Sequence, residues 1–204
     1  MRRALLLSMV LLSASALAAA QTPPPQQPPK GQMPDLGRPT KPDDALPLFD
    51  FDKYFIGKWT FEWDMPDGPL GPAGRLEGTT VYTALGNGKY QAMTEATGPA
   101  GKVTIKELIT YQREQKTLTR DVTDSRGFTY SQKGTIGGDL GGSYNIYFES
   151  DPVKIAGQSV RLKHLLRLTS PLGYRVSATV SVDNGPFTNY GTPWWRKQPA
   201  AGLR

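Results

Sequence analysis

The sequence contains no cysteine and only one histidine among its 204 residues. Without cysteine there is no disulfide, no thiol nucleophile and no lipidated N-terminal cysteine, so the core must hold without covalent cross-links. One histidine cannot supply the three or four nitrogen and sulfur ligands of a zinc site. No G-x-S-x-G motif occurs, and the glycine-rich stretch 137–142 lacks the lysine of a phosphate-binding loop. The sequence therefore offers none of these catalytic arrangements.

Charge is scattered, and no run of five or more like charges occurs. The chain has 24 basic and 18 acidic residues, a formal net charge of +6. Such a distribution is typical of a solvated surface. It argues against nucleic acid as a partner and against a polybasic membrane anchor.

Residues 1–20 have the three parts of a secretory signal peptide. Arg2 and Arg3 precede an apolar run, which ends at the small residues Ala18-Ala19-Ala20. The run is shorter than the roughly 20 apolar residues of a membrane span, although an uncleaved anchor is the alternative. We expect cleavage before Gln21, export to the periplasm or medium, and no stable membrane insertion afterwards. Cleavage leaves 22 basic and 18 acidic residues, a net charge of about +4.

Proline dominates residues 21–47, which hold nine of the eighteen prolines of the chain. Proline lacks a backbone donor and fixes φ, so this composition predicts an extended, disordered tether rather than a folded element. A PxxP ligand for a partner domain is the alternative. Residues 198–204 are expected to form a disordered tail.

Residues 48–197 show the pattern of a β-domain. The aromatic stretch 48–57 could form a helical turn packed over the strands after it, and from Gly57 onward apolar residues alternate with polar ones. About ten short strands are separated by turn signals, including Gly86-Asn87-Gly88, without an amphipathic helix between them. The pattern predicts an all-β fold, an antiparallel up-and-down β-barrel of about ten strands. A two-sheet β-sandwich is the alternative.

Several polar residues occupy the apolar face of their predicted strands. His164 lies between Leu162 and Leu166, and Glu107 shares a face with flanking isoleucines. Such groups either satisfy one another in a structural network or line a cavity that orients a small molecule. We assign to a ligand-binding lining the residues Trp63, Tyr82, Glu107, Arg120, Tyr130, Gln132 and His164.

The start of the first predicted strand, Gly57-Lys58-Trp59, resembles the G-x-W opening of lipocalins and the wider calycin group. The chain is more closely similar to the DUF1579 family of uncharacterised bacterial proteins. That similarity includes the hairpin from Tyr111 to Leu118 and the turn at 181–185. The resemblance implies a calycin-like barrel in which Gly57 and Trp59 close one end. It also implies a late arginine, here Arg196, packed on the Trp59 indole.

The function favoured by these observations is an exported, monomeric barrel that binds a small, partly apolar ligand without catalysis and without a cofactor. One alternative is an acid–base enzyme that uses Glu107 and His164. A second is haem binding with His164 as axial ligand, by fold analogy with the ten-stranded nitrobindin barrels. A third is a structural or interaction domain held near its partner by the tether.

Overall fold

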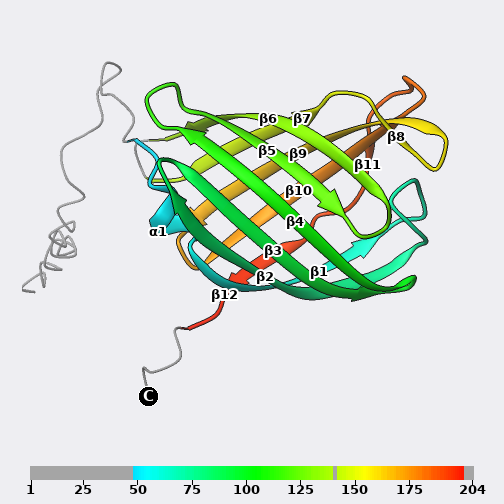
Figure 1. Cartoon of the computed structure of the whole chain (residues 1–204), viewed down its shortest axis with the longest axis horizontal. Helices are drawn as coiled ribbons and strands as arrows, with labels where there is room; N and C mark the ends of the chain where they lie inside the picture. Colours follow the sequence, from blue (N-terminus) through cyan, green and yellow to red (C-terminus); the bar gives the residue numbers. More distant parts are fainter. Residues whose placement is uncertain (1–47, 140–141, 200–204) are drawn as a thin grey trace, which may run out of the picture. The chain divides into compact units, whose positions relative to one another are not determined.

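The computed structural model describes residues 48–139 and 142–199, which contain twelve strands and one short helix. Ten strands follow one another in chain order, each antiparallel to its neighbours, and β12 closes the ring by pairing with both β10 and β1. Their winding around a common interior is visible in Figure 1. The ten strands are β1 (Gly57–Met65), β2 (Gly74–Gly86), β3 (Lys89–Gly98), β4 (Gly101–Gln112), β5 (Thr117–Asp124), β6 (Phe128–Gly138), β7 (Tyr144–Ser150), β9 (Gln158–Ser170), β10 (Gly173–Val182) and β12 (Trp194–Lys197). The predicted up-and-down barrel is confirmed, and the closed ring excludes the two-sheet sandwich.

Two shorter strands lie outside this ring. β8 (Val153–Ile155) pairs only with β9, and β11 (Thr188–Asn189) pairs only with β10. The predicted signal peptide and the predicted tether fall outside the described residues. Gln198, assigned to the tail by sequence, instead donates its backbone N–H to the carbonyl of Lys58 at 2.8 Å. The hydrogen bonding of the barrel thus reaches one residue beyond the predicted boundary.

Side-chain alternation places the apolar face of each strand inside the barrel, as the period-two pattern predicts. Strand β9 shows this most regularly, because every second residue from Val160 to Leu168 is buried, His164 included. The predicted hairpin at 86–88 is also present. Asn87 and Gly88 have φ values of 52° and 70°, the positive values that a tight type I′ connection between β2 and β3 needs.

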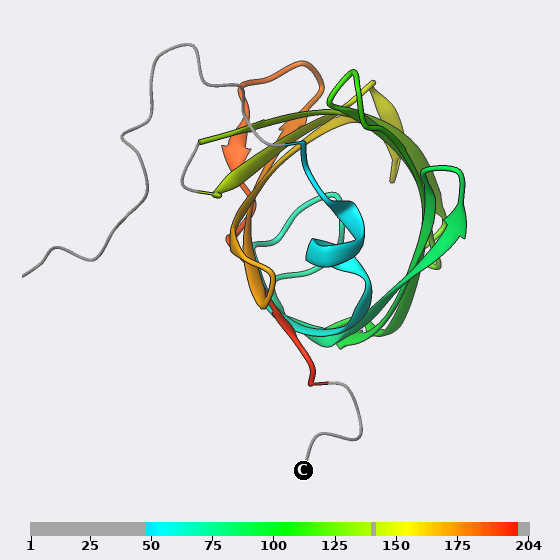
Figure 2. The ribbon, with the colours of Figure 1, turned by 90° about the vertical axis from the view of Figure 1, so that its left-hand side faces the viewer.

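A helical turn, α1 (Phe51–Phe55), closes one end of the barrel. The Asp50 carboxylate caps it by accepting the Lys53 N–H at 3.1 Å. The end-on view of Figure 2 shows α1 inside the ring of strands, where its aromatic side chains pack. The Tyr111 hydroxyl donates to the Phe49 carbonyl at 2.8 Å and anchors the approach to the helix. No helix in this part of the chain is long and apolar enough to cross a membrane.

Trp59 lies under α1 and is fully buried. Its indole N–H donates to the Phe55 carbonyl at 2.7 Å. The cation over its ring is Lys197, whose Nζ lies 5.3 Å from the ring centroid, and not Arg196 as predicted. Strand alternation explains the correction. Lys197 pairs directly with Trp59, whereas Arg196 pairs with Thr60 and is exposed on the outer face.

The ring has one seam where strand pairing stops early. The β1–β12 ladder ends at Glu62 and Trp194, and the segment 190–193 then runs between β1 and β10. Three backbone bonds hold this segment to β10. Val176 N–H donates to the Pro193 carbonyl and Ala178 N–H to the Gly191 carbonyl, both at 3.0 Å, and Tyr190 N–H donates to the Ala178 carbonyl at 2.8 Å. On the β1 side, the Trp63 indole N–H donates to the Tyr190 carbonyl at 2.8 Å.

Gly191→Ala is expected to destabilise the protein by about 2–4 kcal/mol, more than a matched glycine substitution. Gly191 has φ of +107°, and a Cβ there would lie 2.4 Å from Trp63 Nε1 and 2.9 Å from the Asp64 carbonyl oxygen. Gly127 has a similar φ of +96° but open space around it, so Gly127→Ala should cost only about 1–2 kcal/mol. Urea unfolding of both variants measures the difference. Equal losses would show that the seam does not pack tightly at Gly191.

Candidate binding cavity

A cavity of about 90 Å³ lies inside the barrel. Its lining draws on both apolar clusters of the interior, the one next to α1 and the one toward the opposite end. One wall is polar and comes from β4, β5, β6 and β9. The other is largely aromatic and comes from β1, β2, β10 and β12. The polar wall contains Glu107, Arg120, Tyr130 and His164, and the aromatic wall contains Phe61, Trp63, Tyr82, Tyr174 and Trp195.

Arg120 is the centre of the polar wall. Its Nη1 donates to Glu107 Oε2 at 3.2 Å, and its Nε donates to Gln132 Oε1 at 2.7 Å. Its Nη2 lies 2.5 Å from Nδ1 of His164, and its guanidinium carbon lies 4.3 Å from the ring centroid of Phe148. The strand registers bring these partners within reach. Gln132 is directly opposite Arg120, and Glu107, which pairs with Val122, is a diagonal neighbour of Arg120 on β4. One guanidinium thus connects an acid, an amide and an imidazole.

The contact with Arg120 fixes the tautomer of His164. A guanidinium only donates hydrogen bonds, so Nδ1 must be the unprotonated, accepting nitrogen and the ring proton must be on Nε2. Gln132 Oε1 also lies 3.2 Å from Nδ1 and would favour a proton there, but the contact with the cationic Arg120 is shorter, 2.5 Å, and decides the assignment. In residues 48–139 and 142–199 no hydrogen bond is recorded for Nε2 of His164. His164 therefore presents an uncommitted N–H donor at the cavity.

Electrostatics keep this wall in one protonation state. Burial, followed by the charge of Arg120, holds the pKa of His164 well below its usual range. Burial lowers the pKa of Arg120, but Glu107 and nearby tyrosines outweigh it and the pKa is raised on balance. Burial is the largest factor raising the pKa of Tyr130 to about 12. At neutral pH the wall therefore contains a cationic Arg120, a neutral His164 and a neutral Tyr130.

The aromatic wall is ordered by ring stacking and hydroxyl contacts. The Trp195 ring is nearly parallel to the rings of Phe61 and Tyr174, with centroids 4.9 and 5.3 Å away. The hydroxyls of Tyr82 and Tyr174 are 3.0 Å apart. The stacked rings give the cavity one apolar side.

Six of the seven residues assigned by sequence line this cavity, namely Trp63, Tyr82, Glu107, Arg120, Tyr130 and His164. Gln132 is fully buried behind them and supports Arg120. Glu107 and His164 do not contact each other through a hydrogen bond, because Arg120 lies between them and binds both. Sequence reasoning missed Phe61, Tyr174 and Trp195 as lining residues. Their alternation with polar neighbours was a usable signal, but only closure of the ring shows that three strands bring them together.

The cavity does not fit a haem. Sites for drug-sized ligands and cofactors usually enclose about 300–1,000 Å³, whereas this one encloses about 90 Å³. Within the described part of the chain there is also no cluster of three or more histidine, cysteine or acidic side chains placed to hold a metal ion.

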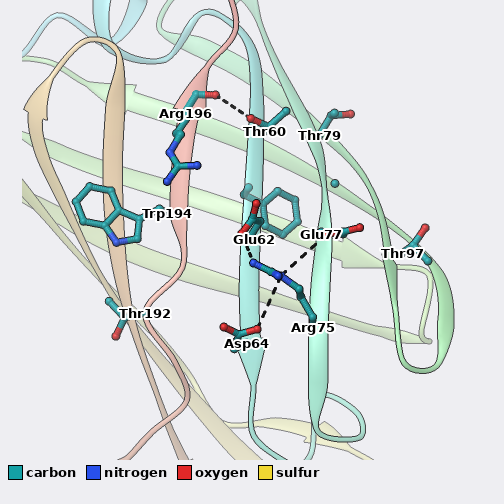
Figure 3. Close-up of a pocket in the computed structure, with 12 residues that line it drawn as sticks. Thr60, Glu62, Asp64, Arg75, Glu77, Thr79, Thr97, Thr192, Trp194 and Arg196 are labelled. Atoms are coloured by element: carbon teal, nitrogen blue, oxygen red, sulfur yellow. Dashed lines mark hydrogen bonds and ion pairs between the residues drawn. The ribbon is translucent and has the colours of Figure 1, made fainter.

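A larger groove of about 550 Å³ lies on the outer face of β1, β2 and β12 (Figure 3). Arg75 is at its centre and forms an ion pair with Glu62, with Asp64 and Glu77 at 3.9 and 4.0 Å. These side chains are 54–88% exposed, so water screens their charges and the pairs contribute little. The groove has the features of a solvated surface, whereas the interior cavity holds buried polar groups with uncommitted donors.

Fold and cavity together define the class of this protein, a closed up-and-down β-barrel with a small two-walled interior site. No protein-family model and no curated protein sequence matches the chain. Among solved structures, Rv2717c from M. tuberculosis is similar at a TM-score of 0.59 and 13% identity, over 71% of this chain and 92% of that one. A de novo designed fluorescence-activating β-barrel matches at a TM-score of 0.43 and 15% identity, over 74% of this chain and 100% of that one. At 13% identity, the similarity to Rv2717c supports the fold alone.

Proposed function

We propose that this protein binds a small, partly apolar molecule inside its barrel and does not transform it. The observation that carries the proposal is the pairing of a polar wall that has uncommitted hydrogen-bond donors with a stacked aromatic wall. Buried polar groups normally find partners within the protein. A donor such as Nε2–H of His164, left facing a cavity, is explained by a ligand that accepts its hydrogen bond.

The same geometry disfavours the acid–base alternative. A general base needs an available lone pair. The Nδ1 lone pair of His164 accepts from Arg120, and Nε2 already carries the proton. One oxygen of Glu107 is likewise bound to Arg120 at 3.2 Å, which leaves only its second oxygen uncommitted. This polar wall is suited to orienting a molecule and poorly suited to moving a proton.

Export and assembly state extend the proposal. The signal-like residues 1–20 and the proline-rich residues 21–47 support an exported barrel on a tether. We keep the monomer as part of the proposal, and the scattered charge argues against a nucleic-acid partner. The DUF1579 resemblance stays a prediction from sequence.

Native mass spectrometry of protein purified without denaturation tests the proposed function. We expect a co-purifying mass of a small organic compound that is released on unfolding. Ala178→Leu should abolish it, because Ala178 lines the cavity and three added carbons fill the space. The matched control Ala84→Leu lies on an exposed position of β2 and should keep the bound mass.

Three results would count against the proposal. The first is wild-type protein with no added mass, and the second is an added mass that survives in Ala178→Leu. The third is a Soret absorbance band that disappears in His164→Ala, which would favour the haem alternative. Because overpacking costs about 1–3 kcal/mol, circular dichroism must first show that Ala178→Leu is folded.

A further inference from the structure

Charge is balanced within the cavity. Of the side chains that line it, only Glu107 and Arg120 are ionised, and they form an ion pair at 3.2 Å. Both are largely buried, with side-chain exposures of 14% and 12%. A bound anion would lie near the Glu107 carboxylate, and a bound cation would lie near Arg120. Neither ion would find a free charge of opposite sign, because Glu107 and Arg120 already pair with each other. Since an unpaired buried charge is strongly unfavourable, the cavity disfavours ions of either sign.

Several hydrogen-bond donors on this surface are uncommitted. Nε2–H of His164 and the hydroxyl of Tyr130 have no hydrogen-bond partner among the described residues. The hydroxyls of Tyr82 and Tyr174 share one bond, so one of the two protons is left over. Acceptors are present as well, namely the second carboxylate oxygen of Glu107 and the tyrosine hydroxyl oxygens. The N–H of His164, however, can only donate, so the ligand must place an acceptor against it.

Size and shape narrow the choice further. The cavity of about 90 Å³ is well below the roughly 300–1,000 Å³ of sites for drug-sized ligands, so its ligand is a small molecule. The nearly parallel rings of Trp195 and Tyr174 line one side. A ligand with an apolar end matches this wall.

We infer that the cavity selects a small, uncharged molecule with a carbonyl-type acceptor and an apolar end. Its oxygen accepts the hydrogen bond from Nε2–H of His164, and its apolar end lies against Trp195 and Tyr174. This inference rests on the proposed function and adds to it the charge and polarity of the ligand.

A series of isosteric probes tests the inference. Acetamide, acetate and acetamidinium have the same flat four-atom skeleton and differ in charge. We expect saturable binding of acetamide by two-dimensional NMR titration, with an affinity at least tenfold higher than that of acetate or acetamidinium. Equal or tighter binding of either ion inside the cavity would overturn the inference while leaving the proposed function intact. Failure of all three probes to bind would count against both.

Substitutions at the two donors identify the contact. His164→Met removes the N–H donor and leaves only a weak sulfur acceptor for Arg120, so acetamide affinity should fall at least tenfold. His164→Gln offers an amide donor and should recover part of it. Tyr130→Phe disturbs no recorded hydrogen bond of the described residues, which makes it the variant most certain to fold. It should weaken acetamide binding severalfold. Unchanged affinity in both His164→Met and Tyr130→Phe would overturn the proposed donors.

Discussion

Replacing Arg120 with methionine is expected to lower the free energy of unfolding by about 3–5 kcal/mol, because Glu107 is then a buried charge without a partner. The substitution also removes the bonds to Gln132 and His164 and the contact with the Phe148 ring. The double variant Arg120→Met/Glu107→Gln removes both charges and should recover most of the loss. Chemical denaturation monitored by tryptophan fluorescence measures all three proteins.

Arg75→Met is the matched control for this prediction. Arg75 also contacts carboxylates, but on the outer face, where these side chains are at least half exposed. Exposed ion pairs contribute about 0–1 kcal/mol, so the control should change little. A small effect of Arg120→Met, similar to that of Arg75→Met, would show that water reaches the polar wall freely and that the cavity is not an enclosed site.

Stability is expected to fall as pH decreases from 6.5 to 5, with a slope of about 1.4 kcal/mol per pH unit. Burial and Arg120 lower the pKa of His164 in the folded protein, so below about pH 6.5 the unfolded chain binds one more proton than the folded chain. The contribution is fully present above pH 6.5 and is lost as pH falls toward the folded pKa. His164 is the only histidine, so no second imidazole obscures the profile.

The groups that share the cavity with His164 are Arg120, Glu107 and three tyrosines, Tyr82, Tyr130 and Tyr174. The pKa values of Arg120 and of the tyrosines are all raised, so these groups do not titrate in this window. His164→Gln should therefore give a flat profile between pH 5 and 6.5. A wild-type profile that is flat there, or a slope that persists in the variant, would show that His164 is not held neutral.

The strand pattern was sufficient for predicting the barrel and most of the polar wall. Glu107 and His164 occupy apolar faces of regular strands, where alternation over many residues fixes the side-chain direction. The helical turn at 51–55 followed from its density of aromatic residues. These predictions hold because each depends on a local sequence pattern that no neighbouring strand overrides.

Other features depend on which strands meet, which no local pattern contains. Strand β12 has only four residues, too few for alternation alone to choose between Arg196 and Lys197 as the cation over Trp59. The position of Arg120 between Glu107 and His164, and with it the His164 tautomer, depends on the registers of β4, β5 and β9. The small size of the cavity likewise follows from packing across the barrel.

The central claim is that ligand binds inside the barrel, and the four tryptophans test it directly. Each gives one indole N–H signal in a ¹H–¹⁵N NMR spectrum. Trp63 and Trp195 line the cavity, Trp59 lies under α1, and Trp194 is half exposed in the outer groove. Titration with acetamide should shift the Trp63 and Trp195 signals and leave those of Trp59 and Trp194 in place. A shift confined to Trp194, or no shift at any indole, would contradict the account.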